Sequence, residues 1–379
     1  MLVISLYAYA FLSEFILIYP VYALLFTDTG LSVAQVSTLF AIWSVTGLVL
    51  EIPSGAWADA VSRRLLLFLG PLLIGLGFAL WVLLPSYWMF AAGFVLWGAG
   101  EALVSGAYEA LAYEELERRG QEHRYAGVMG RANAFALAAA AAAIGLAAPV
   151  FAAGGYAAVG AASVLACVLT AVTALTLPEH RPRGGERSLG YLAILKEGAG
   201  LVRRDRGVRH AVLLVALVTA IWGALEEYVP YLAAETGVST ATIPLLVLLV
   251  WVGITAGGLL AEPAERLPSR PYALLLALAT AAMAVGAISG RPAGFVAIAL
   301  AFGTFQLAQV LADARLQARI TGSARATVTS VAGLGTNVMT LGVYTAYGAA
   351  SSYASHGVTF ALLALPYLLI ALLVARSRQ

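Results

Sequence analysis

The sequence is short of charge, of lysine and of cysteine. Only 11% of its 379 residues are charged, whereas 61% are hydrophobic. A soluble domain of this length would need far more charge to cover its surface, so the composition indicates an integral membrane protein. The single cysteine, Cys167, excludes a disulfide within the chain. The four histidines are scattered without metal-ligand spacing, so we expect no metal.

The sequence also lacks the motifs of an energy-converting or catalytic protein. No G-x-x-x-x-G-K-[ST] loop is present to cradle nucleotide phosphates, so ATP is not the expected energy source. We find no cluster of nucleophilic or metal-binding residues and no attached signalling domain. We therefore expect no enzyme, no cofactor and no nucleic-acid partner.

Long apolar runs fill most of the chain. Runs of about twenty residues predict membrane-spanning helices, because barrel strands would alternate over about ten. We place twelve spans, at residues 3–26, 34–56, 65–84, 87–112, 126–151, 155–177, 209–232, 240–261, 271–290, 292–314, 326–348 and 357–375. The prediction is an all-α membrane protein with two pseudo-symmetric six-helix bundles, residues 1–178 and 209–379. A hydrophilic linker, residues 179–208, joins them, and Leu189 to Val202 is expected to form an amphipathic helix.

Positive charge is unevenly distributed between the predicted loops. Every lysine and arginine except Arg131 and Arg291 lies on the side of the membrane that holds both chain ends. The positive-inside rule places that side in the cytoplasm. Because the alanine-rich, arginine-rich composition is typical of GC-rich bacteria, we expect a multi-pass protein of a bacterial inner (cytoplasmic) membrane with both termini cytoplasmic.

Three short patterns recur in the same order in the two halves. They are an acidic-Thr-Gly-apolar-Ser run, a proline in the span before it, and a Gly–acid–Arg triplet spaced by four residues. The copies are Asp28–Ser32 and Glu235–Ser239, Pro20 and Pro230, and Gly55, Asp59 and Arg63 against Gly258, Glu262 and Arg266. Such duplication predicts parallel six-helix repeats with a substrate cavity between them near the membrane midplane.

The stretch SGAWADAVSRR between the second and third spans resembles the cytoplasmic signature of the major facilitator superfamily. The matching positions are Gly55, Asp59, Arg63 and Arg64, whereas Ala60 replaces a residue that is often basic in the family. With the twelve spans and the basic central linker, the chain is identified as a member of that superfamily, similar to its drug and metabolite exporters. The resemblance implies that Asp59 latches the two halves together when the inner gate is closed. The alternative is that these charges only anchor the loop.

Two carboxyl groups at membrane depth are candidates for carrying a proton. Glu14 shares one face of the first span with Tyr7 and Phe11, at spacings of four and three residues. In the resembled fold, the first and fourth spans line the central cavity. Charged groups in such apolar surroundings are costly and functional by default, so Glu14 is our first candidate for proton coupling.

Glu101 of the fourth span is the second candidate for proton coupling. It lies on a stripe with Trp97, Ser105 and Tyr108, which are candidates for lining the cavity together with Tyr7 and Phe11. The alternative for Glu101 is a structural ion pair with Arg131 of the fifth span. In the second half, the polar candidates at membrane depth are Gln306, Gln309 and Asn337. These amides either bind substrate or form hydrogen bonds between helices.

We predict a secondary active transporter that exports small amphiphilic molecules in exchange for protons by alternating access. Aromatic and acidic residues outnumber amides in the predicted cavity, and Gly145–Gly155 resembles the Gly/Pro signature of the family's drug–proton antiporters, although Ala148 precedes its proline. The alternative is a proton symporter or facilitator that imports a small nutrient, and a membrane-embedded sensor or enzyme comes third. The expected partners are the small-molecule substrate, protons and the lipid bilayer, and we expect a monomer.

Overall fold

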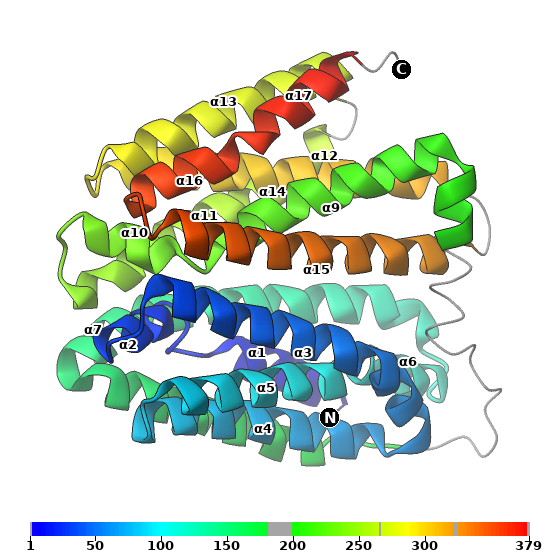
Figure 1. Ribbon diagram of the computed structural model, residues 1–379. Helices are drawn as coiled ribbons and strands as arrows, with labels where there is room; N and C mark the ends of the chain where they lie inside the picture. Colours follow the sequence, from blue (N-terminus) through cyan, green and yellow to red (C-terminus); the bar gives the residue numbers. More distant parts are fainter. Residues whose placement is uncertain (1, 181–198, 265–266, 321–323, 377–379) are drawn as a thin grey trace. The chain divides into compact units, whose positions relative to one another are not determined.

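The structure is a computed structural model that describes residues 2–180, 199–264, 267–320 and 324–376, without the side chains of 51–60 and 324–326. Regular structure within these ranges is entirely helical (Figure 1). The helices are α1 (Leu2–Glu14), α2 (Tyr22–Asp28), α3 (Val33–Ala60), α4 (Arg63–Leu83), α5 (Tyr87–Val104), α6 (Ala107–Glu117), η1 (Glu122–Arg124), α7 (Tyr125–Leu175), α9 (Arg206–Glu226), α10 (Val229–Glu235), η2 (Thr240–Thr242), α11 (Ile243–Leu259), α12 (Ala261–Ala264), α13 (Ser269–Ile288), α14 (Gly294–Arg319), α15 (Ala324–Ala350), α16 (His356–Ala364) and α17 (Pro366–Arg376).

The chain forms two compact units. Unit 1 holds residues 1–31 and 42–191, and unit 2 holds residues 32–41 and 192–379. The division therefore falls within the hydrophilic linker, and the first turns of α3 group with unit 2. Most of the amphipathic helix expected over residues 189–202 lies outside the described residues, although residues 199–204 are helical.

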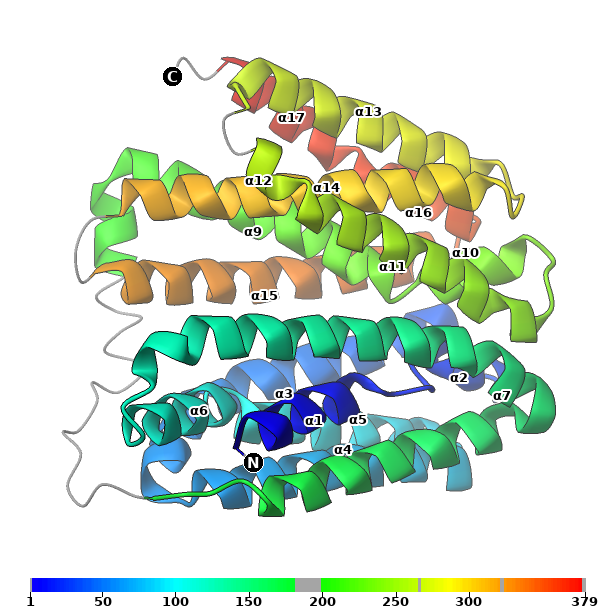
Figure 2. The same cartoon turned by 180° about the vertical axis from the view of Figure 1, so that it is seen from behind.

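Unit 1 is built around α4 and α7. Helix α4 packs against α5 and α7, and α1 packs against α7. Helix α7 has two arms, which turn at Gly154 and Gly155 (Figure 2). The φ of Gly155 is +58°, in the left-handed region that favours glycine. The arms of α7 correspond to the predicted fifth and sixth spans.

Unit 2 has a matching arrangement. Helix α14 packs against α9, α11 and α13, while α15 packs against α9. Helix α13 also packs against both α16 and α17 (Figures 1 and 2). Each unit thus holds the helices of one predicted half, with the start of α3 as the exception.

The predicted twelve-span, all-α fold is confirmed. Nine helical stretches of the described residues are long and apolar enough to cross a membrane. One of them, Glu122–Leu175, contains both arms around the turn of α7 and so supplies two spans. The first span, which is broken into α1 and α2, and the more polar α15 complete the set.

The first span is not the continuous helix that its apolar run predicts. Helix α1 ends at Glu14, and α2 begins only at Tyr22. Within the break, the backbone N–H of Ile18 donates to the hydroxyl of Ser163 on α7 at 3.0 Å. Irregular backbone at membrane depth requires such partners, because lipid supplies none. A side chain far along the sequence therefore makes this break tolerable.

The seventh predicted span is also interrupted, between α9 and α10. Upstream of that break, the hydroxyl of Tyr367 accepts a hydrogen bond from the Trp222 N–H at 3.1 Å and donates to the Val218 carbonyl at 2.7 Å. Pro230 follows at the start of α10. The first span of each predicted half is thus interrupted immediately after a glutamate, Glu14 or Glu226.

Close glycine contacts hold α11 against α14. A Cβ atom on Gly257 would overlap the carbonyl oxygen of Gly303, and one on Gly253 would overlap that of Ala299. Such small residues let two helix backbones approach closely inside a membrane. The α11–α14 interface therefore depends on the absence of side chains at these positions.

We expect Gly257→Val to destabilise unit 2 by about 1–3 kcal/mol, because the added methyl groups force α11 away from α14. The matched control is Gly333→Val on α15, where no atom lies within 4 Å of the added Cβ. Thermal unfolding of both purified variants measures the difference. Equal unfolding midpoints would contradict the role assigned to this glycine contact.

Large apolar side chains cover much of the outer surface. Leu83, Trp88, Leu259 and Val285 are each at least 70% exposed. A soluble protein rarely exposes such continuous apolar surface, whereas lipid tails solvate it well. The exposed side chains are therefore consistent with the membrane-spanning assignment of the helices.

Candidate functional site

Unit 1 holds a carboxylate between two indole rings. Trp97 and Glu101 lie one turn apart on α5, and the Trp97 Nε1–H donates to Glu101 Oε1 at 2.7 Å. Trp43 of α3 donates from Nε1 to Glu101 Oε2 at 3.0 Å. Each carboxylate oxygen thus accepts a charge-assisted hydrogen bond from a rigid donor. These bonds fix the orientation of the carboxylate.

Aromatic rings surround this carboxylate. Tyr19, from the break between α1 and α2, stacks on Trp97 with ring centroids 5.3 Å apart. The Trp43 and Trp97 rings lie 4.7 Å apart. We call Tyr19, Trp43, Trp97 and Glu101 the aromatic–acid cluster. The cluster combines a negative charge with flat apolar faces, and Trp97 is buried whereas Glu101 is exposed.

Glu14 is the last residue of α1 and is half-buried. Within the described part of the chain, no hydrogen bond or ion pair joins its carboxylate to another side chain. The helix stops there, and the Ile16 N–H already bonds to the Glu14 backbone carbonyl at 2.9 Å. This carboxylate is therefore placed at a local break, where a change in backbone conformation would change its surroundings.

The other α1 candidates make aromatic contacts. Tyr7 packs against Phe135 of α7, with ring centroids 5.2 Å apart. The Tyr7 hydroxyl is buried without a hydrogen-bond partner among the described residues. Phe11 stacks on Phe15, with centroids 5.5 Å apart. The unpartnered phenol makes Tyr7 a candidate hydrogen-bond donor to a ligand.

The predicted stripe on the fourth span is divided by a break. Helix α5 ends before Ser105, which is exposed, and α6 begins after Gly106. Tyr108 lies beyond that break in the core, where its hydroxyl donates to the Leu6 carbonyl at 2.8 Å. Arg131 is exposed on α7, and it takes part in none of the ion pairs found among the described residues. The structure therefore brings Trp97 and Glu101 together but not Glu101 and Arg131.

The polar candidates of unit 2 are spread over two helices. Gln309 of α14 accepts a hydrogen bond from Trp222 Nε1 of α9 at 3.0 Å, so it makes a contact between helices. Gln306 packs beside Gly258 of α11. Asn337 is half-buried on α15 and, within the described ranges, forms no side-chain hydrogen bond.

The loop signature is described only in part. Gly55 and Asp59 lie near the end of α3, but their side chains are outside the described residues, and so is Arg266 of the second copy. Arg63 begins α4 and forms an ion pair with Glu114 of α6. Of the remaining signature residues, Arg64 and Glu262 are exposed and Gly258 is half-buried.

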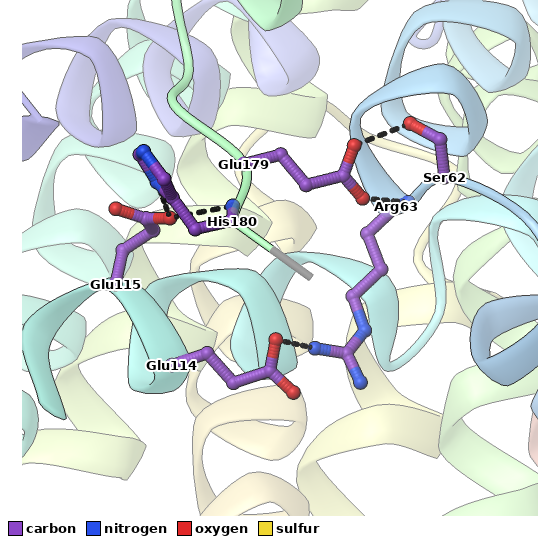
Figure 3. A network of polar contacts seen from close by, with 6 residues as sticks. All are labelled: Ser62, Arg63, Glu114, Glu115, Glu179 and His180. Atoms are coloured by element: carbon purple, nitrogen blue, oxygen red, sulfur yellow. Dashed lines mark hydrogen bonds and ion pairs between the residues drawn. The ribbon is translucent and has the colours of Figure 1, made fainter. Parts of the chain in front are cut away.

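The start of the linker is held at the same end of unit 1 (Figure 3). Glu179 accepts from the Ser62 hydroxyl at 2.5 Å and from the Arg63 backbone N–H at 2.6 Å. The Glu115 carboxylate, only 3% exposed, accepts from the His180 backbone N–H at 3.0 Å and lies 2.8 Å from its Nδ1. Carboxylates of α6 and the linker thus connect the α3–α4 loop to the end of the sixth span.

The sequence profile of the Major Facilitator Superfamily matches residues 3–341. The chain belongs to this superfamily. Its fold agrees with that of solved transporters across almost the whole chain. No curated protein matches the sequence.

The nucleoside transporter NupG is 11% identical and aligns with a TM-score of 0.79 over 100% of both chains. A bacterial homolog of the human lysosomal transporter Spinster is 15% identical with a TM-score of 0.71, covering 98% of this chain and 95% of the other. A D-xylose–proton symporter is 14% identical with a TM-score of 0.70, covering 99% and 96%. At these identities the comparison shows the shared fold alone.

Several members of the site carry little signal in the sequence. Trp43 and Tyr19 are uncharged aromatic residues in apolar runs, so nothing local distinguishes them from packing residues. The pairing of Glu115 with His180 joins positions 65 residues apart. The acidic run at the end of α6, next to a basic loop, was the one available indication of a charged network.

We expect Asp59→Asn and Arg63→Gln to slow transport about tenfold, the order of effect of losing one charge-assisted contact. If the signature latches the inner gate as the resemblance implies, both changes free that gate and the populations of the two access states shift. The matched control is Arg64→Gln, which removes the neighbouring exposed charge. Transport rates of folded variants in proteoliposomes measure the effect. Equal rates for all three variants would show that the motif only anchors the loop.

Proposed function

We propose that this member of the superfamily is a proton-coupled secondary transporter that exports small amphiphilic molecules by alternating access. The observation that carries the proposal is the Glu101 carboxylate on α5, which the indole N–H groups of Trp43 and Trp97 hold by two hydrogen bonds. Superfamily members bind small-molecule substrates, often together with protons. In this chain, we assign proton coupling to Glu14 and Glu101.

The geometry supports a link between protonation and the shape of the cluster. As an anion, Glu101 accepts from both indole N–H groups. When it takes up a proton, the carboxyl group loses its charge and one oxygen becomes a donor. Both indole bonds then lose their charge assistance, and the indole that faces the protonated oxygen loses its acceptor. Proton uptake therefore loosens Trp43 or Trp97. The wall formed by the flat rings changes with the protonation state of the carboxyl group.

The aromatic–acid cluster also supports an amphiphilic substrate. The rings of Tyr19 and Trp43 provide apolar area with few rotatable bonds, and the carboxylate provides a single polar contact. A ligand with an apolar body and one polar or cationic group matches this combination. Amides, which suit molecules rich in hydroxyl groups, are absent from the cluster.

Uptake of a small nutrient is the second candidate function. Its support is that the solved structures with this fold include a nucleoside transporter and a D-xylose–proton symporter. The same carboxyl groups would serve a symporter, because both directions of coupling need a proton site that is exposed to each side in turn. For either direction we propose a bacterial inner membrane with both chain ends in the cytoplasm.

A flux assay in proteoliposomes tests the proposed function. Purified protein is reconstituted with a pH-sensitive dye inside, and proton gradients of either direction are imposed. Amphiphilic cations are compared with nucleosides and pentoses as substrates. Proton movement opposite to the substrate supports export, movement in the same direction supports uptake, and substrate flux that leaves the dye unchanged contradicts proton coupling. Liposomes without protein provide the background.

A further inference from the structure

Unit 2 contains a cavity that none of the candidate site residues line. Its volume is about 480 Å³, and it lies among the N-terminal parts of α9 and α13 and the C-terminal parts of α14 and α17. Arg315, Arg319 and Ser269 line it together with leucines such as Leu213, Leu214 and Leu373. This volume lies in the range of ligand pockets, about 300–1,000 Å³. The lining combines two positive charges with an apolar wall.

The two arginines are held in place by neutral groups. Arg315 donates to the Leu267 carbonyl at 3.0 Å, and its guanidinium lies over the Tyr272 ring, 4.4 Å from the centroid. Arg319 donates to the Gly207 carbonyl at 3.3 Å. Arg315 is half-buried and Arg319 is exposed, and none of the ion pairs found among the described residues includes either arginine. An anion that enters the cavity is therefore the complementary ligand for both charges.

The start of α13 adds to this preference for a negative charge. Ser269 is the first residue of that helix, which runs to Ile288. The first N–H groups of a helix lack partners within it, and the helix dipole makes this end positive. A phosphate near Ser269 would therefore meet a helix N-terminus and two guanidinium groups.

The apolar wall of the cavity continues onto the outer surface. Leu213 and Leu373 line the cavity, and they are also 50% and 60% exposed. In a membrane-spanning chain, exposed leucines on the outer surface contact lipid tails. A ligand can therefore enter from the bilayer and leave an acyl chain along this wall. A small free anion would make no use of it.

We infer that this cavity binds an anionic phospholipid, with the phosphate at Arg315, Arg319 and Ser269 and an acyl chain along the leucines. Basic pockets between membrane helices at the cytoplasmic side suit anionic head groups. In the predicted orientation, this end of unit 2 lies in that leaflet. The head group of a zwitterionic lipid would bring a further positive charge to a site that already holds two.

Lipid binding to the purified protein tests the inference. Phosphatidylglycerol is titrated in detergent, and bound lipid is counted by native mass spectrometry. Phosphatidylcholine with the same acyl chains and glycerol 3-phosphate, which has none, are the comparison probes. Arg319→Gln should weaken phosphatidylglycerol binding about tenfold, as expected for losing a charge-assisted contact. The matched control is Arg209→Gln, which removes an exposed charge of α9 that does not line the cavity.

A second variant tests the apolar part and does not depend on the arginine. Leu373→Trp fills the cavity from an exposed position, so it should fold and should also reduce phosphatidylglycerol binding. The inference is overturned if neither variant binds less lipid than Arg209→Gln does. It is also overturned if phosphatidylcholine or glycerol 3-phosphate binds as tightly as phosphatidylglycerol.

Discussion

Glu14→Gln is expected to abolish substrate accumulation driven by a proton gradient while substrate binding is retained. Glutamine has nearly the size of protonated glutamate but cannot release a proton. The half-buried carboxylate of Glu14 ends α1 and has no side-chain partner among the described residues, so its charge depends on its surroundings. Alternating access changes those surroundings, and protonation should therefore follow the transport cycle.

Binding and gradient-driven flux, measured from about pH 5.5 to 8.5, separate the two roles. Binding by Glu14→Gln should persist with a weaker pH dependence than in the wild-type protein. The matched control is Glu117→Gln, which removes an exposed carboxylate at the end of α6. If Glu14→Gln still accumulates substrate with unchanged proton stoichiometry, Glu14 does not couple transport, and Glu101 remains as the carrier.

The sequence predicts the spans of the fold but not the place of the break that follows Glu14 within the first span. Hydrophobic runs of sufficient length identify the spans, and the Gly154–Gly155 pair marks the turn between two of them. Pro20 is a local signal for the break between α1 and α2, because proline lacks the N–H that a helix interior needs. The sequence does not indicate where α1 ends or which group satisfies the backbone of the break. That partner, the hydroxyl of Ser163, lies far along the chain.

In the candidate site, the contacts within one helix were predictable from the sequence and the contacts between helices were not. Trp97 and Glu101 are four residues apart in one helix, so spacing alone places them on one face, and they form a hydrogen bond. Trp43 completes the cluster from α3, and no local pattern could assign it to Glu101. The sequence left open whether Gln309 binds substrate or forms a hydrogen bond between helices. In the structure, its side chain accepts a hydrogen bond from Trp222 of another helix.

The repeat of short motifs has a structural counterpart beyond the loop signature. The first span of each predicted half contains a helix that ends at a glutamate, Glu14 in α1 and Glu226 in α9. Each half also places a tryptophan on its next long helix, Trp43 on α3 and Trp251 on α11. Glu14 lies further along the sequence from the repeated motif at Asp28 than Glu226 lies from the motif at Glu235, because the break after α1 is longer than the break after α9. Sequence spacing alone therefore could not show that the two glutamates correspond.

Replacing Glu101 is expected to lower substrate affinity, and the loss should depend on Trp43. Glu101→Gln keeps one acceptor oxygen but turns an amide NH₂ towards the second indole, so it should weaken substrate binding about tenfold. Glu101→Leu loses both acceptor oxygens and should weaken substrate binding about a hundredfold. In a Trp43→Phe background, Glu101→Gln should cost much less, because the second donor is already gone. Substrate titrations of the single and double variants measure this coupling, with Trp88→Phe, a 74% exposed tryptophan, as the matched control. Identical losses from Glu101→Gln in both backgrounds would show that the indole–carboxylate bond plays no part in binding.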